Sequence, residues 1–167
     1  MSQHILTTTH DAVVRIQINR PEKKNALTLA MYDAMSEALL AAEADPAVRV
    51  ILFAGAESCF TAGNDLGDFL DNPPSGEESP VFRFLKTLIA AQKPVLAAVH
   101  GVAVGIGTTM LLHCDLVWAG PSARFQLPFV NLGLTPEAAS SLILPQLMGH
   151  RRAAEKLLLG DTFDAQT

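Results

Sequence analysis

Two glycine-containing segments hold the residues whose types and spacing could do chemistry. The first is FTAGNDL (residues 60–66) and the second is HGVAVGIG (residues 100–107), and each follows a predicted strand. Small residues at a strand-to-helix turn allow close backbone approach, and the amides that begin the next helix are unpaired. Two such turns side by side could donate two N–H groups to one developing oxyanion. Glycines also serve simply as tight-turn residues, and neither segment alone distinguishes the two roles.

Other familiar chemistries lack their usual residues. The glycine cluster reads G-x-x-x-G-x-G rather than the dinucleotide pattern G-x-G-x-x-G, and there is no phosphate loop, G-x-S-x-G elbow or H-E-x-x-H pair. Cys59 and Cys114 are far apart, so two buried thiols are expected and no metal site. We expect His100 and His113 to be structural, and Asp65 and Asp115 to cap or close turns.

Alternating strands and helices must position these segments. Alternation of apolar and polar residues predicts a strand over 13–19, and buried apolar runs predict strands over 48–53 and 94–99. Further strands are expected over 115–119 and 123–126, and 71–80 reads as a surface loop. The fold class is therefore α/β with parallel strand pairing.

The predicted helices have apolar faces that we expect to point inward. One helix follows a Thr28 cap and closes at Asp45-Pro46, short ones cover 108–113 and 151–159, and another begins after Thr135. The inward residues of the helix after the surface loop and of the helix after Thr135 are Phe82, Leu85, Leu88 and Ile89, and Leu142, Ile143 and Leu147, respectively.

The composition and net charge of the chain limit the kinds of partner it could bind. The chain has 167 residues, of which 49% are hydrophobic and 17% charged, and its formal net charge is −5. This length favours one domain over 1–167, and the acidic balance argues against nucleic acid or an anionic membrane as partner. The sequence shows neither a secretory leader nor an apolar run of membrane-spanning length, so we expect a cytoplasmic protein.

Five motifs in order along the chain resemble those of the enoyl-CoA hydratase/isomerase (crotonase) family. They are NRPEKKNAL (19–27), FTAGNDL (60–66), AVHGVAVGIG (98–107), CD (114–115) and FQLPFVNLG (125–133). The resemblance implies a spiral of ββα units that binds an acyl-CoA thioester and polarises its carbonyl between two backbone amides. It assigns those amides to Ala62 and Ile106, and substrate contacts to Lys24, Asn25, Ala26, Leu27, Gly63, Asn64, Asp65, Leu66, Gly105, Phe129 and Leu134, with Lys23 and Lys24 as phosphate partners.

The departures from the family pattern bear on the reaction. Hydratases of the family hold water between two glutamates, and the corresponding positions here are Thr109 and Phe129, neither of which can transfer a proton at neutral pH. A carboxylate lies nearby in LTPEAASS (134–141), which resembles the Δ3,Δ2-enoyl-CoA isomerase branch, where the glutamate of this Pro-Glu site is the base. Glu137 matches it. Thr-Pro-Glu is equally the start of an ordinary helix, with Thr135 as cap and Pro136 in the first turn.

The resemblance therefore implies an isomerase that shifts a double bond from 3-enoyl-CoA to 2-enoyl-CoA in acyl-CoA degradation. One base suffices, and coenzyme A is part of the substrate, so no separate cofactor or metal is expected. Alternatives are another crotonase reaction, such as hydration, or a non-catalytic acyl-CoA-binding protein. Family members usually continue into a further helical segment and form homo-oligomers, typically trimers. We expect that segment to be missing here and the leucines at 157–159 to be exposed or covered by another subunit.

Overall fold

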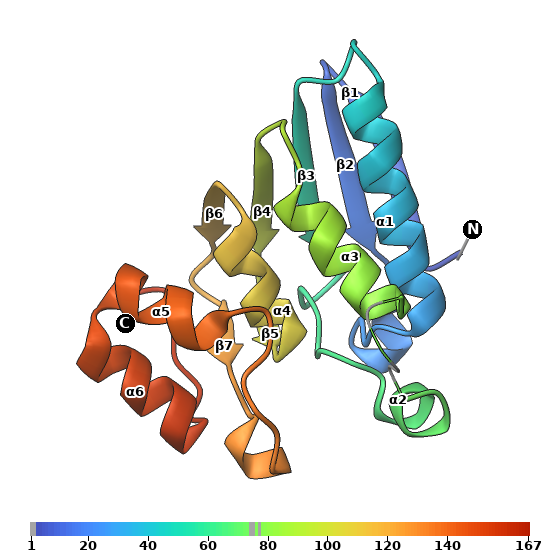
Figure 1. The fold of residues 1–167 in the computed structure, drawn as a ribbon. Helices are drawn as coiled ribbons and strands as arrows, with labels where there is room; N and C mark the ends of the chain where they lie inside the picture. The colour runs from blue at the N-terminus through green and yellow to red at the C-terminus, as the bar shows by residue number, and fades with distance from the viewer. Residues whose placement is uncertain (1–2, 74–75, 77) are drawn as a thin grey trace.

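A computed structural model describes residues 3–73, 76 and 78–167, and its centre is a five-stranded sheet (Figure 1). The strand order is β1-β2-β3-β4-β6, with β1 antiparallel to β2 and all other neighbours parallel. The strands are β1 (Ile5–His10), β2 (Val13–Ile18), β3 (Val50–Gly55), β4 (Val95–Val99) and β6 (Leu116–Ala119). The parallel pairing agrees with the sequence prediction. The sequence analysis missed β1, in which Ile5 is the one buried residue and no alternation of apolar and polar residues marks the strand.

Two long helices, α1 (Leu29–Ala44) and α3 (Pro80–Ile89), pack against each other on one face of the sheet (Figure 1). Rings from both helices and from β3 meet in the core: Phe84 lies 5.7 Å from Tyr32 and 6.0 Å from Phe53, measured between ring centroids. Large buried aromatic side chains supply much of the hydrophobic stabilisation of a domain this size. This packing fixes the end of α1 that leads into the functional segments.

Two of the four residues predicted to face inward from α3 are wrong. Leu85 and Leu88 are buried as expected, but Phe82 and Ile89 are exposed. Val81 and Phe84 take their places in the core. The buried residues, at 81, 84, 85 and 88, have the i, i+3, i+4, i+7 spacing of one helical face, which Phe82 and Ile89 do not share. Of the predicted loop 71–80, residues 74–75 and 77 lie outside the described residues.

The two glycine-containing segments contain more regular structure than predicted. The second holds a short strand, β5 (Val102–Val104), which pairs in parallel with β7 (Arg124–Gln126) in a separate two-stranded sheet. It then enters α4 (Ile106–Thr109) and the 3-10 helix η2 (Met110–His113). The first leads into α2 (Leu66–Asp71), which the sequence analysis missed because six residues are too few to show helical periodicity. The 3-10 turns η1 (Pro21–Lys23) and η3 (Val130–Leu132) complete the surroundings.

The C-terminal helices α5 (Ser140–Met148) and α6 (His150–Leu159) lie to one side of the sheet (Figure 1). The predicted start of α5 is wrong, because Thr135 does not cap the helix: the chain from 135 to 138 is not helical, and the N-cap of α5 is Ala139. The predicted inward face is also wrong: Leu142 is 64% exposed and Leu147 68%, whereas Leu144 is buried. The segment that carries Glu137 is thus a turn before the helix rather than its first turn.

The end of α6 divides its three leucines between a small core and the surface. Leu157 packs against a cluster formed by Leu127, Phe129, Leu144 and Ala153. Leu158 and Leu159 are 69% and 57% exposed, as the sequence led us to consider. No helix among the described residues is both long and apolar enough to cross a membrane.

Candidate active site

A cavity of about 690 Å³ opens between the two glycine-containing segments and the chain that precedes α5. Three groups of residues form its wall: those around Ala62–Gly67, those around Val104–Ile106, and those between Pro128 and Glu137. Of the residues expected to act on substrate, the cavity brings together the following: Ala26, Ala62, Gly63, Asn64, Asp65, Leu66, Gly105, Ile106, Phe129, Leu134 and Glu137.

The backbone N–H of Ile106 is an available hydrogen-bond donor at the cavity wall. Ile106 is the first residue of α4, and no described residue accepts a hydrogen bond from its amide. The preceding Gly105 has φ 55° and ψ −118°, a conformation that a side chain would oppose. Gly105 donates to the carbonyl of Gln126 over 2.9 Å, which ties the turn to β7 and fixes its direction. The geometry therefore fits the oxyanion-donor role predicted for Ile106.

The corresponding prediction for Ala62 is wrong. The Ala62 N–H donates to the carbonyl oxygen of Lys24 over 3.0 Å, so it is already committed to a bond within the protein. The next amide, that of Gly63, donates to the hydroxyl of Thr61 over 3.1 Å. Neither group is available to a substrate oxygen in this arrangement.

The amide that is available in this segment belongs to Asn64. Asn64 forms an isolated parallel bridge with Leu27. The Leu27 N–H donates to the carbonyl of Gly63, and the Asp65 N–H donates to the carbonyl of Leu27. In a parallel bridge the bonds come from the neighbours of the bridging residue, so its own N–H points away from the partner strand. In the described part of the chain this N–H has no acceptor, and Asn64 lines the cavity. The residue types at 61–64 do not show which amide is available, so sequence reasoning had no signal that could have identified Asn64.

Close backbone approach explains Gly63 at this wall. A Cβ added to Gly63, where φ is +91°, would lie 2.8 Å from the carbonyl oxygen of Val104. The Thr61 segment in turn bridges β5, with hydrogen bonds to Val102 and from Val104. The two glycine-containing segments therefore lie directly against each other, as two donors to one oxyanion require.

Several predicted substrate contacts lie elsewhere. Asn25 and Leu27 are buried and do not line the cavity. The Asn25 side chain donates to the carbonyls of Ala56 and Cys59, and the backbone carbonyl of Asn25 accepts from the Thr61 hydroxyl over 2.6 Å. Its role in this structure is to position the first glycine-containing segment, and substrate contact by its side chain is not supported.

Of the two lysines predicted to meet phosphate, Lys23 lines the cavity and Lys24 does not. Both lie on the surface, and Lys24 has a left-handed backbone with φ 50° at the end of η1. That turn directs the Lys24 carbonyl to the Ala62 amide. Lys24 therefore contributes to the site through its backbone.

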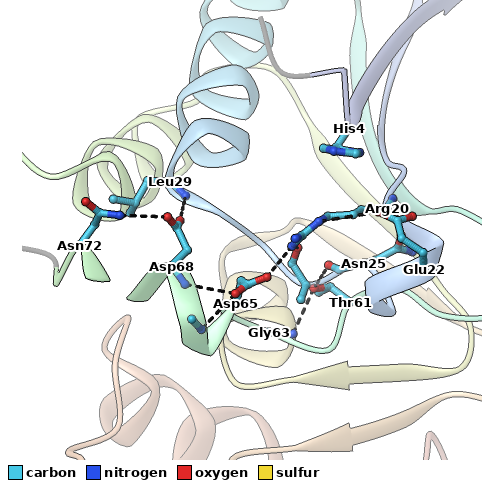
Figure 2. Close-up of polar contacts among 12 residues, drawn as sticks. His4, Arg20, Glu22, Asn25, Leu29, Thr61, Gly63, Asp65, Asp68 and Asn72 are labelled. Carbon is cyan, nitrogen blue, oxygen red and sulfur yellow. Dashed lines mark hydrogen bonds and ion pairs between the residues drawn. The ribbon is translucent and has the colours of Figure 1, made fainter. Parts of the chain in front are cut away.

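An ion pair joins the segments that form one end of the cavity (Figure 2). Arg20 donates to Asp65 over 2.6 Å and to the carbonyl of Ala26 over 3.0 Å. Asp65 also accepts from the amides of Gly67 and Asp68, so it caps α2 as a capping role predicts. The Asp68 carboxylate accepts from Leu29 N–H at the start of α1. Hydrogen bonds from Arg20 and from the amides of Asp68 and Gly67 hold the pKa of Asp65 below its ordinary value, so the Asp65 carboxylate is a structural anion.

Glu137 is the second carboxylate at the cavity and lies in a different environment. Burial raises its pKa from 4.5 to about 7, an effect partly opposed by a hydrogen bond from Thr109. The Thr109 hydroxyl lies 3.4 Å from Glu137 Oε1. A carboxylate with a pKa near neutrality is suited to take and return a proton. The helix-start interpretation of this residue is wrong, since α5 begins three residues later.

The two positions at which hydratases carry glutamates contain no acid here. Phe129 lines the cavity, and Thr109 is fully buried with its hydroxyl toward Glu137. Leu66, Phe69, Leu132 and Leu134 add to an apolar wall around the carboxylate. The site thus contains one carboxylate with a raised pKa, in apolar surroundings.

Tyr32 is a residue of the site that the sequence analysis missed, because it bonds the side chain of Asn64 at the cavity wall. Its hydroxyl, at the buried end of α1, donates to the side-chain oxygen of Asn64. Burial raises the pKa of Tyr32, and the negative charge of Glu137 raises it further, which places the phenol within the field of the carboxylate. On an apolar helical stripe, a tyrosine resembles any core aromatic residue, so no sequence pattern marked it.

The histidines and cysteines stand outside the cavity wall. His100 bonds the carbonyl of Glu57 over 2.6 Å, and His113 bonds that of Ala138 over 2.9 Å. Cys59 is buried and Cys114 partly buried, and burial raises the pKa of Cys114 to about 12. Across the described residues no group of three or more His, Cys, Asp or Glu side chains could hold a metal ion.

Comparisons with known proteins agree with this geometry. The enoyl-CoA hydratase/isomerase family model matches residues 8–167. Enoyl-CoA delta isomerase 2 of Rattus norvegicus is 41% identical over 171 residues, which cover 99% of this chain and 44% of that protein. The chain thus spans less than half the length of this curated relative.

Solved structures give the same result for the fold. Pseudomonas aeruginosa OdaA is 57% identical with a TM-score of 0.94, covering 98% of this chain and 66% of that one. An enoyl-CoA hydratase/isomerase from Pseudoalteromonas atlantica is 42% identical with a TM-score of 0.93, covering 98% of this chain and 65% of that one. The predicted crotonase-like α/β fold is confirmed. By its motifs, its fold and its cavity, this chain belongs to the enoyl-CoA hydratase/isomerase family.

Proposed function

We propose that the protein isomerises 3-enoyl-CoA thioesters to their conjugated 2-enoyl isomers. The observation that carries the proposal is the contrast between the two carboxylates at the cavity. Asp65 is bonded to Arg20 and has a lowered pKa, whereas Glu137 lies in apolar surroundings with a pKa of about 7. Carboxylates whose environments separate their pKa values in this way have different roles. Glu137 is the group suited to move a proton.

The reaction follows from one base and two amides. The Glu137 carboxylate takes a proton from C2 of the thioester, and the electron pair passes into the carbonyl as an enolate. The N–H groups of Asn64 and Ile106 would donate to the enolate oxygen, where donors fixed in advance stabilise the developing charge most effectively. The neutral Glu137 then returns the proton to C4, which leaves the double bond between C2 and C3. Atoms and charge balance without a cofactor.

Hydration is the weaker alternative for this site. Syn addition of water requires groups that orient and deprotonate water and then protonate the α-carbon. The positions that carry the two glutamates in hydratases are Thr109 and Phe129 here, and the relatives named as delta isomerases support the isomerase assignment. Part of each relative lies outside the region matched by this chain.

An absorbance assay tests the proposal directly. Conjugation gives a 2-enoyl thioester an ultraviolet absorption that a 3-enoyl thioester lacks, so incubation with 3-hexenoyl-CoA should give a rising signal above the constant absorbance of coenzyme A. Incubation with crotonyl-CoA, which hydration would bleach, should give little change. Bleaching of crotonyl-CoA without conversion of 3-hexenoyl-CoA would instead establish a hydratase, and binding of both without turnover would establish a non-catalytic acyl-CoA-binding protein.

A further inference from the structure

The turn that carries Glu137 adopts a conformation that its own residues disfavour. Ala138 and Ala139 have φ angles of 52° and 51°, and Ser140 N–H donates to the Glu137 carbonyl over 3.0 Å. Two consecutive central residues with positive φ are the mark of a type I′ turn, which favours Asn and Gly. Alanine in the left-handed region costs about 1–2 kcal/mol per residue. Something outside the turn must therefore hold it.

The outside contact comes from His113. Its Nε2 lies 2.9 Å from the carbonyl oxygen of Ala138, the residue that follows Glu137. Because a carbonyl oxygen only accepts hydrogen bonds, this ring nitrogen must carry the proton.

His113 and Thr109 act from the same side. Thr109 ends α4 and His113 ends η2, and both side chains contact the segment that carries Glu137. Thr109 donates to the Glu137 carboxylate, and His113 bonds the backbone one residue later. The same short helical stretch begins with Ile106, whose amide lines the cavity. The helical stretch over 106–113 thus contacts the Glu137 carboxylate and its supporting turn, and it also carries the Ile106 amide.

We propose that His113 is a positioning residue that holds the Glu137 turn in its strained conformation and so fixes the carboxylate relative to the Ile106 amide. This inference rests on the isomerase function proposed above. Displacing a catalytic group by about 1 Å can cost roughly 100-fold in rate. Loss of the His113 bond should therefore reduce turnover more than substrate binding, which depends on other parts of the cavity.

The experiment compares His113→Leu with His113→Gln in the isomerase assay. Leucine fills the space without a donor, whereas glutamine can place an amide N–H near the position of Nε2. We expect kcat of His113→Leu to fall by about 10- to 100-fold with KM within about threefold of the parent, and His113→Gln to recover most of the loss. A merely structural role would lower the melting temperature of both variants and leave kcat of the folded fraction unchanged.

His100→Leu is the matched control. His100 also bonds a backbone carbonyl through Nε2, and its acceptor, Glu57, also has a left-handed backbone with φ 53°. That loop does not line the cavity, so this variant should lose stability without losing kcat. Equal kcat in His113→Leu and the parent would overturn the inference while the proposed function stands. An inactive parent would instead refute the proposed function, and circular dichroism of each variant confirms that the proteins compared are folded.

Discussion

The hydroxyl of Thr109 lies 3.4 Å from the carboxylate of Glu137, and Phe129 lines the same cavity as that carboxylate. In family members that hydrate, both the threonine and the phenylalanine positions carry glutamates. Here the first is a neutral donor that stabilises the ionised form of Glu137, and the second is apolar. The cavity therefore has one carboxylate with a raised pKa, Glu137, and no acid at either of the two positions that carry glutamates in hydratases.

Thr109→Val should move the acidic limb of the pH profile upward. The hydroxyl lowers the pKa of Glu137, so its removal leaves burial unopposed and the carboxylate loses its proton at higher pH than about 7. The measurement is kcat/KM for isomerisation between pH 5.5 and 9. Thr87→Val removes an exposed hydroxyl that bonds Arg83 and should leave the limb in place. A limb that is unmoved, or moved downward, in Thr109→Val would contradict the assignment of Glu137 as the titrating base.

Burial of Glu137 should also affect stability. Its pKa is raised from 4.5 to about 7 on folding, so the folded protein binds the extra proton between these values. The neutral carboxyl is tolerated below pH 4.5, and stability is lost as the pH rises through 7. Glu137→Gln cannot ionise and should therefore gain on the order of 1–3 kcal/mol over the parent between pH 5 and pH 8.5. Urea denaturation at both pH values measures this, and an equal difference at both would refute the shift.

Removal of the Ile106 amide should impair turnover. Proline deletes the N–H but suits the first position of a helix, and Ile106 occupies that position in α4. Ile106→Pro should lower kcat by roughly 100- to 1,000-fold, the usual effect of losing one oxyanion donor. Ile106→Val keeps the amide and most of the buried volume and should retain near-parental kcat. Full activity in a folded proline variant would show that this amide does not contact the enolate.

The Arg20–Asp65 pair should contribute more to stability than an exposed pair. Asp65→Asn removes the charge from a partly buried bond of 2.6 Å and should cost about 1–3 kcal/mol of unfolding free energy. Asp33→Asn breaks the Arg83 pair, in which both side chains are more than 40% exposed, and should cost under about 1 kcal/mol. Urea denaturation at pH 7 measures both losses of unfolding free energy, and the loss in Asp65→Asn should be the larger. Equal losses would mean that Asp65 acts only as a helix cap.

Ala138→Asn combined with Ala139→Gly should stabilise the protein. These residues suit the positive φ angles that the alanines now adopt, so relief of strain should add about 1 kcal/mol and raise the melting temperature by a few degrees. The melting temperature measured by calorimetry checks this. Unchanged or lower stability would show that the turn is not strained in the folded protein.

Sequence patterns predicted the framework of the fold because buried elements are periodic or continuously apolar. The strands that became β2, β3, β4 and β6 were predictable in this way, and so was their parallel pairing. The inward faces of α3 and α5 were not, since each helix has apolar residues both on and off its buried face and residue types alone do not separate them. In α5, Leu142 and Leu147 face outward although their residue type predicts burial.

The family resemblance predicted which segments form the site, but only the structure shows which backbone amides in those segments are available. Ile106 and Glu137 line the cavity as expected, but the available amide of the first segment is that of Asn64 rather than Ala62. Backbone hydrogen bonding alternates along an extended chain, so the choice depends on a register that residue types do not encode. The contacts of Tyr32 and His113 are likewise products of packing between distant segments.

The most direct test of the account is the isomerase rate of Glu137→Gln beside that of Glu37→Gln. Glutamine preserves the size of the side chain but cannot accept a proton from C2, whereas Glu37 is an exposed residue of α1 and serves as the matched control. General bases contribute roughly 100- to 10,000-fold, so we predict that conversion of 3-hexenoyl-CoA by Glu137→Gln falls by that factor while Glu37→Gln matches the parent. Conversion by Glu137→Gln at the parental rate would contradict the assignment of Glu137 as the base.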